Sequence, residues 1–349
     1  MKLLAGLALA SMAVAAPLVD KRAPTPLDVQ LQMQGNSKVK AVISNKGKNN
    51  LKLLKVGTFL DSTAVEKAQV FSGEKTVPFD GVRISLDTSR LDDTAFQSIP
   101  SGESIEVDFD IAEFHDLSAG GKFDVLTSGA LSFAQENDTQ LIGSVPFYSN
   151  RLSAEVDGPQ AFSVRTAFHH KRTQVQSDCS GDKLAVTQAA LSRCAEMASK
   201  AQQAAASGSD DKMTEYFKSS SSDVRSTVSD VFSRIAAECG STDAGDSRYY
   251  CTDVYGACQN GVLAYTVPGG SYMAYCDLYF EQLPASTTAC HGQDQAGTNL
   301  HEMTHLSQIK GTSDFGGYGY DFVQSLTAEQ NLNHADTYAL FANAIDLGC

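Results

Sequence analysis

The placement of the cysteines constrains this chain of 349 residues more than any other feature. All eight cysteines follow the dibasic pair Lys171-Arg172, and none precedes it. The charge changes at the same point, because residues 173–349 carry a formal net charge of −12 and residues 1–172 carry only −2. A change in composition at a dibasic site predicts a precursor that is cut after Arg172. We therefore expect one domain before the pair and a second domain, residues 173–349, after it.

The first residues predict export from the cell. Lys2 precedes an apolar run from Leu3 to Val14, and Ala13-Val14-Ala15 supplies the small residues of a cleavage site. This is the arrangement of a secretory signal peptide, and the run is too short to span a bilayer comfortably. We expect residues 1–15 to be a signal peptide, residues 16–172 to be a propeptide, and the mature protein to be secreted and extracellular.

In a secreted protein the cysteines are expected to form disulfides. Eight cysteines in an oxidising compartment predict four disulfides, although their spacing alone leaves 105 pairings open. A zinc site built from four cysteines is not indicated, because the closest pair, Cys251 and Cys258, has six residues between its members. Structural zinc sites usually have two to four residues between paired cysteine ligands.

The two halves differ in hydrophobic period. Residues 27–33 and 105–111 alternate apolar and polar side chains, which predicts strands with one wet face and, for this half, a small antiparallel sandwich. We find no catalytic group here and expect His115, His169 and His170 to be ordinary surface residues.

The second half reads mainly as helix. Apolar side chains recur at helical spacing over residues 184–198 and 224–235, whereas residues 248–280 favour short strands. A helix is expected around residues 292–309, and a last one from Thr327, with Gln330 completing a capping box. The expected fold class is α+β: a mainly helical domain with a short sheet, preceded by a β-rich propeptide domain.

One motif carries chemistry. Residues 301–305 read His-Glu-Met-Thr-His, so on a helix His301 and His305 lie one turn apart on one face and can bind a single Zn²⁺. Glu302 lies about 100° around the helix, where it can act as general base on a water molecule that the metal activates. With seven histidines in the chain, chance gives about 0.005 such matches.

The spacing leaves the third zinc ligand open. The metzincin pattern requires Gly and His where this chain has Gln308 and Gly311. Glu329, 24 residues past His305, fits the spacing of a thermolysin-like peptidase. Asp314 is nine residues past His305, and the glycines that flank it allow the chain to turn back toward the metal.

At this point the sequence resembles a known family. HEMTH followed by GTSDFGGYGY is similar to the aspzincin pattern, HExxH plus GTxDxxYG, and in particular to the deuterolysins, which are secreted fungal neutral zinc proteases. The segments DVYGACQNGVLAYTVP, CDLYFEQLP, CHGQDQAGTNLHEMTH and NHADTYALFANAIDLGC also resemble deuterolysin sequence. The resemblance covers essentially all of residues 173–349, and more loosely the order of signal, propeptide and Lys-Arg junction.

The resemblance implies a zincin-like zinc metalloendopeptidase with one zinc per chain. It implies that His301, His305 and Asp314 are the metal ligands and that Glu302 is the general base. It also places Tyr279 where deuterolysins have a tyrosine that assists catalysis, with a hydroxyl that could donate to the developing oxyanion.

The chain departs from the family pattern in two places. It has one extra residue between Asp314 and Tyr318, and it has eight cysteines where the family has six. The family pattern implies three disulfides, which are Cys179–Cys251, Cys258–Cys276 and Cys290–Cys349. The two remaining cysteines, Cys194 and Cys239, form the additional pair. Asp336 could orient a ligand histidine or simply lie on a helix surface.

Charge points to the partners. The formal net charge of −14 argues against nucleic acid or an anionic membrane as a partner. After Arg248 the chain has one basic residue, Lys310, and ten acidic ones. A negative field at the site predicts cationic protein or peptide substrates, and the resemblance agrees, since deuterolysins favour histones and protamines.

The propeptide is expected to act as inhibitor and folding aid of a monomeric enzyme. It has no cysteine, so a thiolate cannot block the zinc, whereas His169 or His170 could reach the metal. The alternative hypothesis outside the enzymes is a non-catalytic extracellular binding protein, stabilised by disulfides, in which HEMTH is a chance match.

Overall fold

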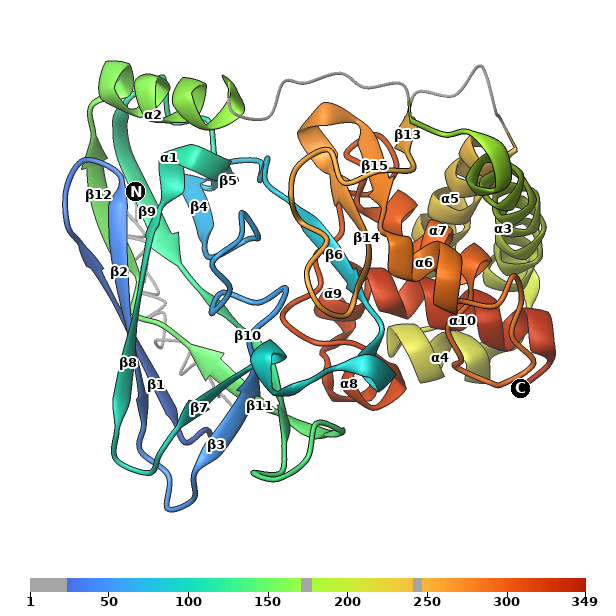
Figure 1. Cartoon of the computed structure of the whole chain (residues 1–349), viewed down its shortest axis with the longest axis horizontal. Helices are drawn as coiled ribbons and strands as arrows, with labels where there is room; N and C mark the ends of the chain where they lie inside the picture. The colour runs from blue at the N-terminus through green and yellow to red at the C-terminus, as the bar shows by residue number, and fades with distance from the viewer. Residues whose placement is uncertain (1–23, 171–177, 241–246) are drawn as a thin grey trace, which may run out of the picture.

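The computed structural model describes residues 24–170, 178–240 and 247–349, with the side chains of residues 166–170 left out. A β-rich N-terminal region (residues 24–170) lies beside a mainly helical C-terminal region (residues 178–349), as Figure 1 shows. The predicted signal peptide and the Lys171-Arg172 pair fall outside the described residues. Within the described part of the chain, no helix is both long and apolar enough to cross a membrane.

Strands of the N-terminal region form three antiparallel sheets, ordered β1-β2-β8, β11-β10-β3-β7 and β12-β9-β4-β5. The strands are β1 Leu27–Met33, β2 Lys38–Asn45, β3 Leu51–Leu54, β4 Gln69–Ser72, β5 Lys75–Thr76, β6 Arg83–Leu86, β7 Phe96–Ile99, β8 Ser104–Asp110, β9 Gly121–Leu126, β10 Ser128–Ala134, β11 Leu141–Tyr148 and β12 Leu152–Val156. Two helices, α1 Ile111–Phe114 and α2 Gly158–His170, and two short 3₁₀ turns, Thr88–Arg90 and Asp93–Ala95, complete the region.

The predicted alternation of buried and exposed side chains is present. The region has three antiparallel sheets, so the predicted small sandwich describes it only in part. Leu27, Val29 and Leu31 of β1 are buried while Gln30 and Gln32 are exposed, as a strand over an apolar core requires. The three sheets share this core, which includes side chains of strands β1, β2, β3, β4 and β9 to β12. Strand β6 belongs to none of the three.

The prediction that His115 is a surface residue is wrong. Its side chain is buried, and its ring nitrogens lie 3.1–3.2 Å from the main-chain carbonyls of Val77, Pro78 and Ala68. A buried imidazole bonded to main-chain carbonyls has a structural role. The side chains of His169 and His170 lie outside the described residues.

Helices of the C-terminal region pack around one another and around a short mixed sheet. They are α3 Gly181–Ser207, α4 Asp210–Phe217, α5 Ser222–Cys239, α6 Asp277–Gln282, α7 Gln295–His305, α8 Tyr320–Ser325, α9 Ala328–Asn331 and α10 Ala335–Leu347. The strands are β13 Arg248–Tyr250, β14 Val262–Val267 and β15 Tyr272–Tyr275, and the sheet order is β13-β15-β14-β6. The short strands expected over residues 248–280 are confirmed.

Helix α7 lies at the centre of this region. It contacts α3, α5, α10 and β14, and nearly all of its residues are buried. Asp294 caps it, with a side chain that accepts the Gly297 N–H at 2.7 Å. The helix is shorter than the predicted span of 292–309, but it carries the whole His-Glu-His motif into the interior.

The last predicted helix is two helices. Thr327 and Gln330 form the predicted capping box, but α9 ends at Asn331 and α10 begins only at Ala335. The break lets the backbone at Asn333 and Ala335 pair with Ser313, through hydrogen bonds of 2.8 and 3.3 Å. A tertiary contact here outweighs a continuous helical pattern.

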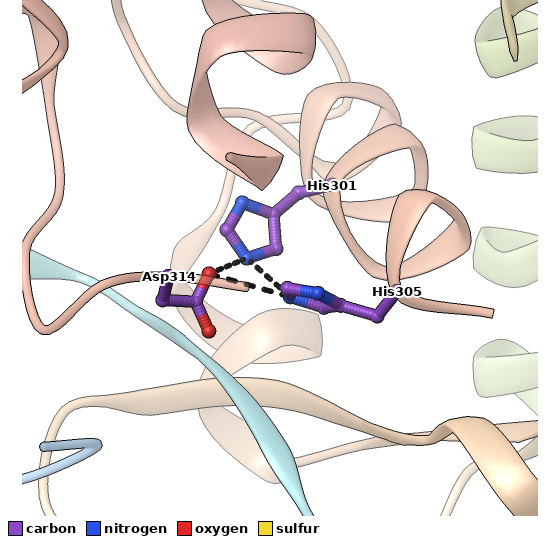
Figure 2. Close-up of side chains that lie close together, drawn as sticks. All are labelled: His301, His305 and Asp314. Carbon is purple, nitrogen blue, oxygen red and sulfur yellow. Dashed lines mark hydrogen bonds and ion pairs between the residues drawn. The ribbon is translucent and has the colours of Figure 1, made fainter. Parts of the chain in front are cut away.

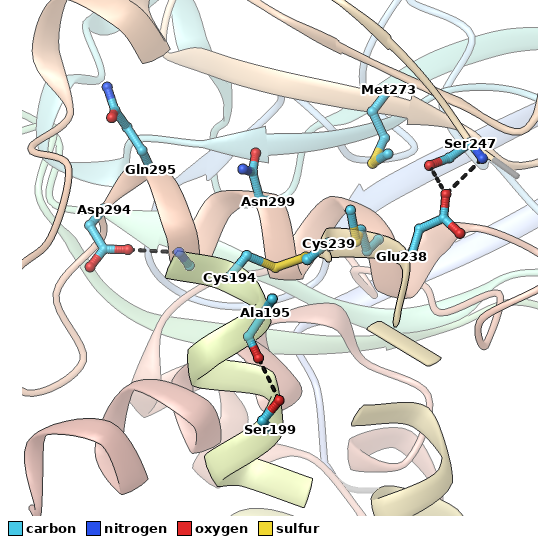
Figure 3. Close-up of a disulfide and its surroundings, with 12 residues drawn as sticks. Cys194, Ala195, Ser199, Glu238, Cys239, Ser247, Met273, Asp294, Gln295 and Asn299 are labelled. Atoms are coloured by element: carbon cyan, nitrogen blue, oxygen red, sulfur yellow. Dashed lines mark hydrogen bonds between the residues drawn. A yellow bond between two sulfur atoms is a disulfide. The ribbon is translucent and has the colours of Figure 1, made fainter. Parts of the chain in front are cut away.

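The three disulfides implied by the resemblance and the additional pair are all present. They are Cys179–Cys251, Cys194–Cys239, Cys258–Cys276 and Cys290–Cys349. Cys194–Cys239 joins α3 to α5 beside the residues at the start of α7, as Figure 3 shows. Cys290–Cys349 ties the chain end to the segment that leads into α7.

Candidate metal centre

Three side chains converge on one point (Figure 2). The Nε2 atoms of His301 and His305 are 3.2 Å apart, and each lies 3.4 Å from Oδ1 of Asp314. Among the residues that the structure describes, this is the one group of three or more His, Cys, Asp or Glu side chains whose donor atoms meet in this way. The structure therefore brings together the three side chains that the resemblance implied as zinc ligands.

These donors fit zinc. Zinc bonds of about 2.0–2.1 Å in a tetrahedron place neighbouring donor atoms about 3.3–3.4 Å apart. The three observed separations are 3.2, 3.4 and 3.4 Å. Oδ1 of Asp314 is buried without a hydrogen-bond partner, which an ion would supply. Two imidazoles and one carboxylate leave one tetrahedral position free, as in catalytic rather than structural zinc sites.

Asp314 reaches the histidines because the chain reverses after α7. Gly311, at φ +70°, makes a turn that favours glycine. The Thr312 N–H then donates to the Thr304 carbonyl at 3.1 Å, which brings the returning strand back onto the helix end. The prediction that flanking glycines return this carboxylate to the metal agrees with the observed path.

The Nδ1 atoms of both histidines have hydrogen-bond partners. Asp336 Oδ1 accepts the Nδ1–H of His301 at 2.8 Å, and its Oδ2 accepts the Gly319 N–H at 2.6 Å. The Thr312 carbonyl lies 3.1 Å from Nδ1 of His305. Such partners fix the ring orientation and direct each Nε2 lone pair at the metal. Asp336 is thus buried against a ligand and is not a helix-surface carboxylate.

The charge state of Asp314 suits a site for a cation. Burial raises the pKa of Asp314, but the charges of the neighbouring His305 and His301 outweigh burial and hold that pKa well below its ordinary value. The Asp314 carboxylate therefore stays ionised, as a metal ligand must.

Glu302 lies next to the ligands and is fully buried. Its Oε2 accepts the Thr266 hydroxyl at 2.6 Å, whereas its Oε1 has no hydrogen-bond partner. Burial raises the pKa of Glu302 to about 8, against the lowering effect of the neighbouring His301 charge. A carboxylate made this basic is suited to accept a proton near neutral pH. Thr266, on β14, is a positioning residue that the sequence analysis did not single out.

The structure does not bring Tyr279 to the three ligands. Its side chain is fully buried, and its hydroxyl lies 3.3 Å from Oδ1 of Asn299 and 3.4 Å from the Gln295 carbonyl. Asn299 is two residues before His301 and so points about 160° away around the helix. The catalytic role that the resemblance implied for Tyr279 stays a prediction.

Another tyrosine lies beside the ligands instead. The ring of Tyr318 is stacked toward His301, with centroids 6.3 Å apart. Burial, followed by the nearby charges of Asp314, Asp336 and Glu302, raises the pKa of Tyr318 well above its ordinary value, so its hydroxyl keeps its proton. The sequence pattern draws attention to Tyr318 only through the extra residue that separates it from Asp314, and it assigns Tyr318 no role.

Glu329, the alternative third ligand, is exposed on α9 and does not belong to the cluster. The spacing that suits a thermolysin-like peptidase is therefore not realised in the fold.

Comparisons with known proteins identify the family of the chain. The deuterolysin metalloprotease (M35) family profile matches residues 2–349. A neutral protease 2 homolog of Colletotrichum graminicola is 53% identical over 351 residues, covering 100% of both chains. Neutral protease 2 of Aspergillus oryzae is 40% identical over 346 residues, covering 98% of this chain and 97% of that protein. Among solved structures, a zinc peptidase from Grifola frondosa aligns at a TM-score of 0.40 and 24% identity, covering 48% of this chain and 97% of that one.

Proposed function

Because the chain belongs to the deuterolysin metalloprotease (M35) family and is a zinc metalloendopeptidase, we propose that His301, His305 and Asp314 bind its zinc ion and that Glu302 is the general base. The observation that carries this assignment is the triangle of donor atoms, 3.2–3.4 Å on each side, with the fully buried Glu302 following His301 on the same helix. We expect one zinc per chain, and the single converging group among the described residues supports this number.

Each side chain has a separate task in peptide-bond hydrolysis. Zinc, when bound, supplies a Lewis acid that polarises the substrate carbonyl and makes water more acidic. Glu302 takes a proton from the attacking water and can return it to the leaving amine, while Thr266 fixes the carboxylate through Oε2. The Tyr318 hydroxyl donates to the carbonyl oxygen as negative charge develops there. Asp336 holds His301 in the orientation that the metal needs.

We test this proposal by metal removal. The cleaved enzyme is expected to hold one zinc per chain, to lose proteolytic activity in a chelator, and to regain it when zinc is restored. Full activity in metal-free protein would refute the assignment.

We propose that the preferred substrates are cationic proteins and peptides. The C-terminal region supports this through its excess of negative charge, −12 over residues 173–349, and through Lys310 as the one basic residue after Arg248. A cleft within such a field raises the local concentration of cationic chains and speeds their association, most strongly at low salt.

We also propose that the protein is made as a secreted precursor and acts as a monomer. Residues 1–15 would be the signal peptide, residues 16–172 a propeptide that inhibits the enzyme and helps it fold, and residues 173–349 the active enzyme. The four disulfides, all in the C-terminal region, suit an oxidising compartment. N-terminal sequencing of the secreted protein should find Thr173 first, and an active form that retains residues before Arg172 would contradict the scheme.

A further inference from the structure

Strand β6 belongs to the N-terminal region by sequence and to the C-terminal sheet by hydrogen bonding (Figure 1). It pairs antiparallel with β14, so that Arg83 lies opposite Thr266 and Ile84 opposite Tyr265. All four of its residues are buried. Without β6, strand β14 would be an edge strand whose N–H and C=O groups are open to another extended chain.

This edge runs past the candidate metal centre. Thr266, the β14 residue opposite Arg83, donates its hydroxyl to the Glu302 carboxylate at 2.6 Å. Figure 2 shows β6, the cyan ribbon, beside the loop that carries Asp314. Arg83 contacts this loop directly, because its Nη1 lies 3.2 Å from Oγ of Ser313. A chain on the β14 edge therefore lies where a polypeptide must lie to reach Glu302.

Two side chains of the C-terminal region hold the main chain of β6. The Tyr318 hydroxyl donates to the Ile84 carbonyl at 2.7 Å. The Gln293 side-chain amide donates to the Leu86 carbonyl, also at 2.7 Å. Both contacts recognise peptide carbonyls rather than side chains, so they suit an extended polypeptide of any sequence. While Ile84 is in place, the Tyr318 hydroxyl is engaged.

Residues of β6 and of the segment after it line a cavity next to the candidate metal centre. A cavity of about 320 Å³ is lined by His301, Tyr318 and Asp336 from the C-terminal region and by Ser85 and Asp87 from the N-terminal region. The N-terminal region thus supplies a wall of the cavity beside a metal ligand, and a substrate entering there would meet β6 first.

We infer that Arg83–Leu86 is the inhibitory segment of the precursor: β6 keeps the enzyme latent by occupying, as an added strand, the β14 edge on which a substrate main chain would lie. The inference rests on the proposed protease function of the same site. Strand addition of this kind takes its binding energy from main-chain hydrogen bonds and its selectivity from side-chain pockets. It needs no metal-binding residue from the N-terminal region.

The N-terminal region anchors β6 from its own side. Arg83 forms an ion pair with Glu66, and its guanidinium lies 4.4 Å from the centre of the Phe79 ring. Glu66 also accepts the Ser313 hydroxyl at 3.1 Å. The inhibitory strand is thus fixed between its own domain and the ligand loop.

The first test uses the full chain with Lys171→Ala and Arg172→Ala, so that the regions stay joined. Ser85→Pro is designed to break the β6–β14 ladder, because Ser85 is the β6 residue opposite Ala264 of β14 and proline has no N–H to donate to a ladder. Ser153→Pro in β12, an edge strand of another N-terminal sheet, is the matched control. Peptide hydrolysis by the uncut Ser85→Pro chain should rise at least tenfold over its parent, and the control should stay within twofold. No rise in Ser85→Pro, or an equal rise in both variants, would overturn the assignment to β6.

A second measurement does not depend on the folding of a variant. A synthetic peptide of residues 82–87 should inhibit the cleaved enzyme competitively, with an inhibition constant at least tenfold lower than that of residues 104–109 from β8. Equal constants would overturn the inference. If the cleaved parent has no zinc-dependent activity at all, the proposed function fails instead, so the two failures are distinguishable.

Discussion

Replacing Asp336 by asparagine should weaken zinc binding although Asp336 is not a ligand. The carboxylate accepts two N–H groups, from His301 Nδ1 at 2.8 Å and from Gly319 at 2.6 Å. Asparagine keeps the shape but has only one accepting oxygen, so one of these buried donors loses its partner. Gly319 ends the loop that carries Asp314, so the change disturbs two ligands at once.

The expected size of the effect follows from these contacts. Loss of a partner that orients a ligand histidine typically costs 10–100-fold in metal affinity, or about 1.4–2.7 kcal/mol. We expect the upper end for Asp336→Asn, because both the histidine and the loop lose their anchor. An unpaired buried donor should also lower the free energy of unfolding by about 1–3 kcal/mol.

The assay is a zinc titration in chelator-buffered solutions, with the thermal unfolding of the zinc-free protein measured in parallel. Glu329→Gln, which changes an exposed carboxylate on the neighbouring helix α9, is the matched control and should keep the parent's affinity within about twofold. Zinc affinity unchanged in a folded Asp336→Asn protein would refute the claim that Asp336 positions His301.

Three further results are expected. Asp314→Ala should lose stoichiometric zinc by elemental analysis while Glu329→Ala keeps it, and the reverse pattern would restore the thermolysin-like alternative. Cys194→Ala with Cys239→Ala opens a loop of 45 residues, so denaturant unfolding should show a loss of about 4 kcal/mol, and a loss below about 1 kcal/mol would contradict the loop-closure estimate. Protamine should be cleaved faster than a neutral protein at low salt, with an advantage that shrinks as salt rises, and equal low-salt rates would refute electrostatic steering.

Local geometry explains what could be predicted from the sequence. The spacing of His301 and His305 determines their common face once the segment is helical, and the flanking glycines allow Asp314 to return. The strands of the first half and the helices of the second follow from their hydrophobic periods. Three disulfide pairings came from the family resemblance, which left Cys194 and Cys239 as the fourth pair, since spacing alone cannot select among the pairings.

The remaining features depend on tertiary contacts that no local pattern encodes. Thr266 and Asp336 reach the motif from β14 and α10, 36 and 35 residues away from their partners Glu302 and His301. Strand β6 alternates the polar residues Arg83 and Ser85 with the apolar residues Ile84 and Leu86, but this local pattern does not indicate which sheet the strand joins. Its pairing with β14 crosses the boundary that the composition placed after Arg172.

The central claim is that Glu302 is the base of a zinc site formed by His301, His305 and Asp314. The most direct test compares the cleaved parent enzyme with Glu302→Gln for zinc content and casein hydrolysis in the same preparations. We predict one zinc per chain in both proteins and a fall in turnover of at least 10²–10⁴-fold in Glu302→Gln alone, the contribution of a general base. Glu302→Gln with parental activity and parental zinc content would contradict the account.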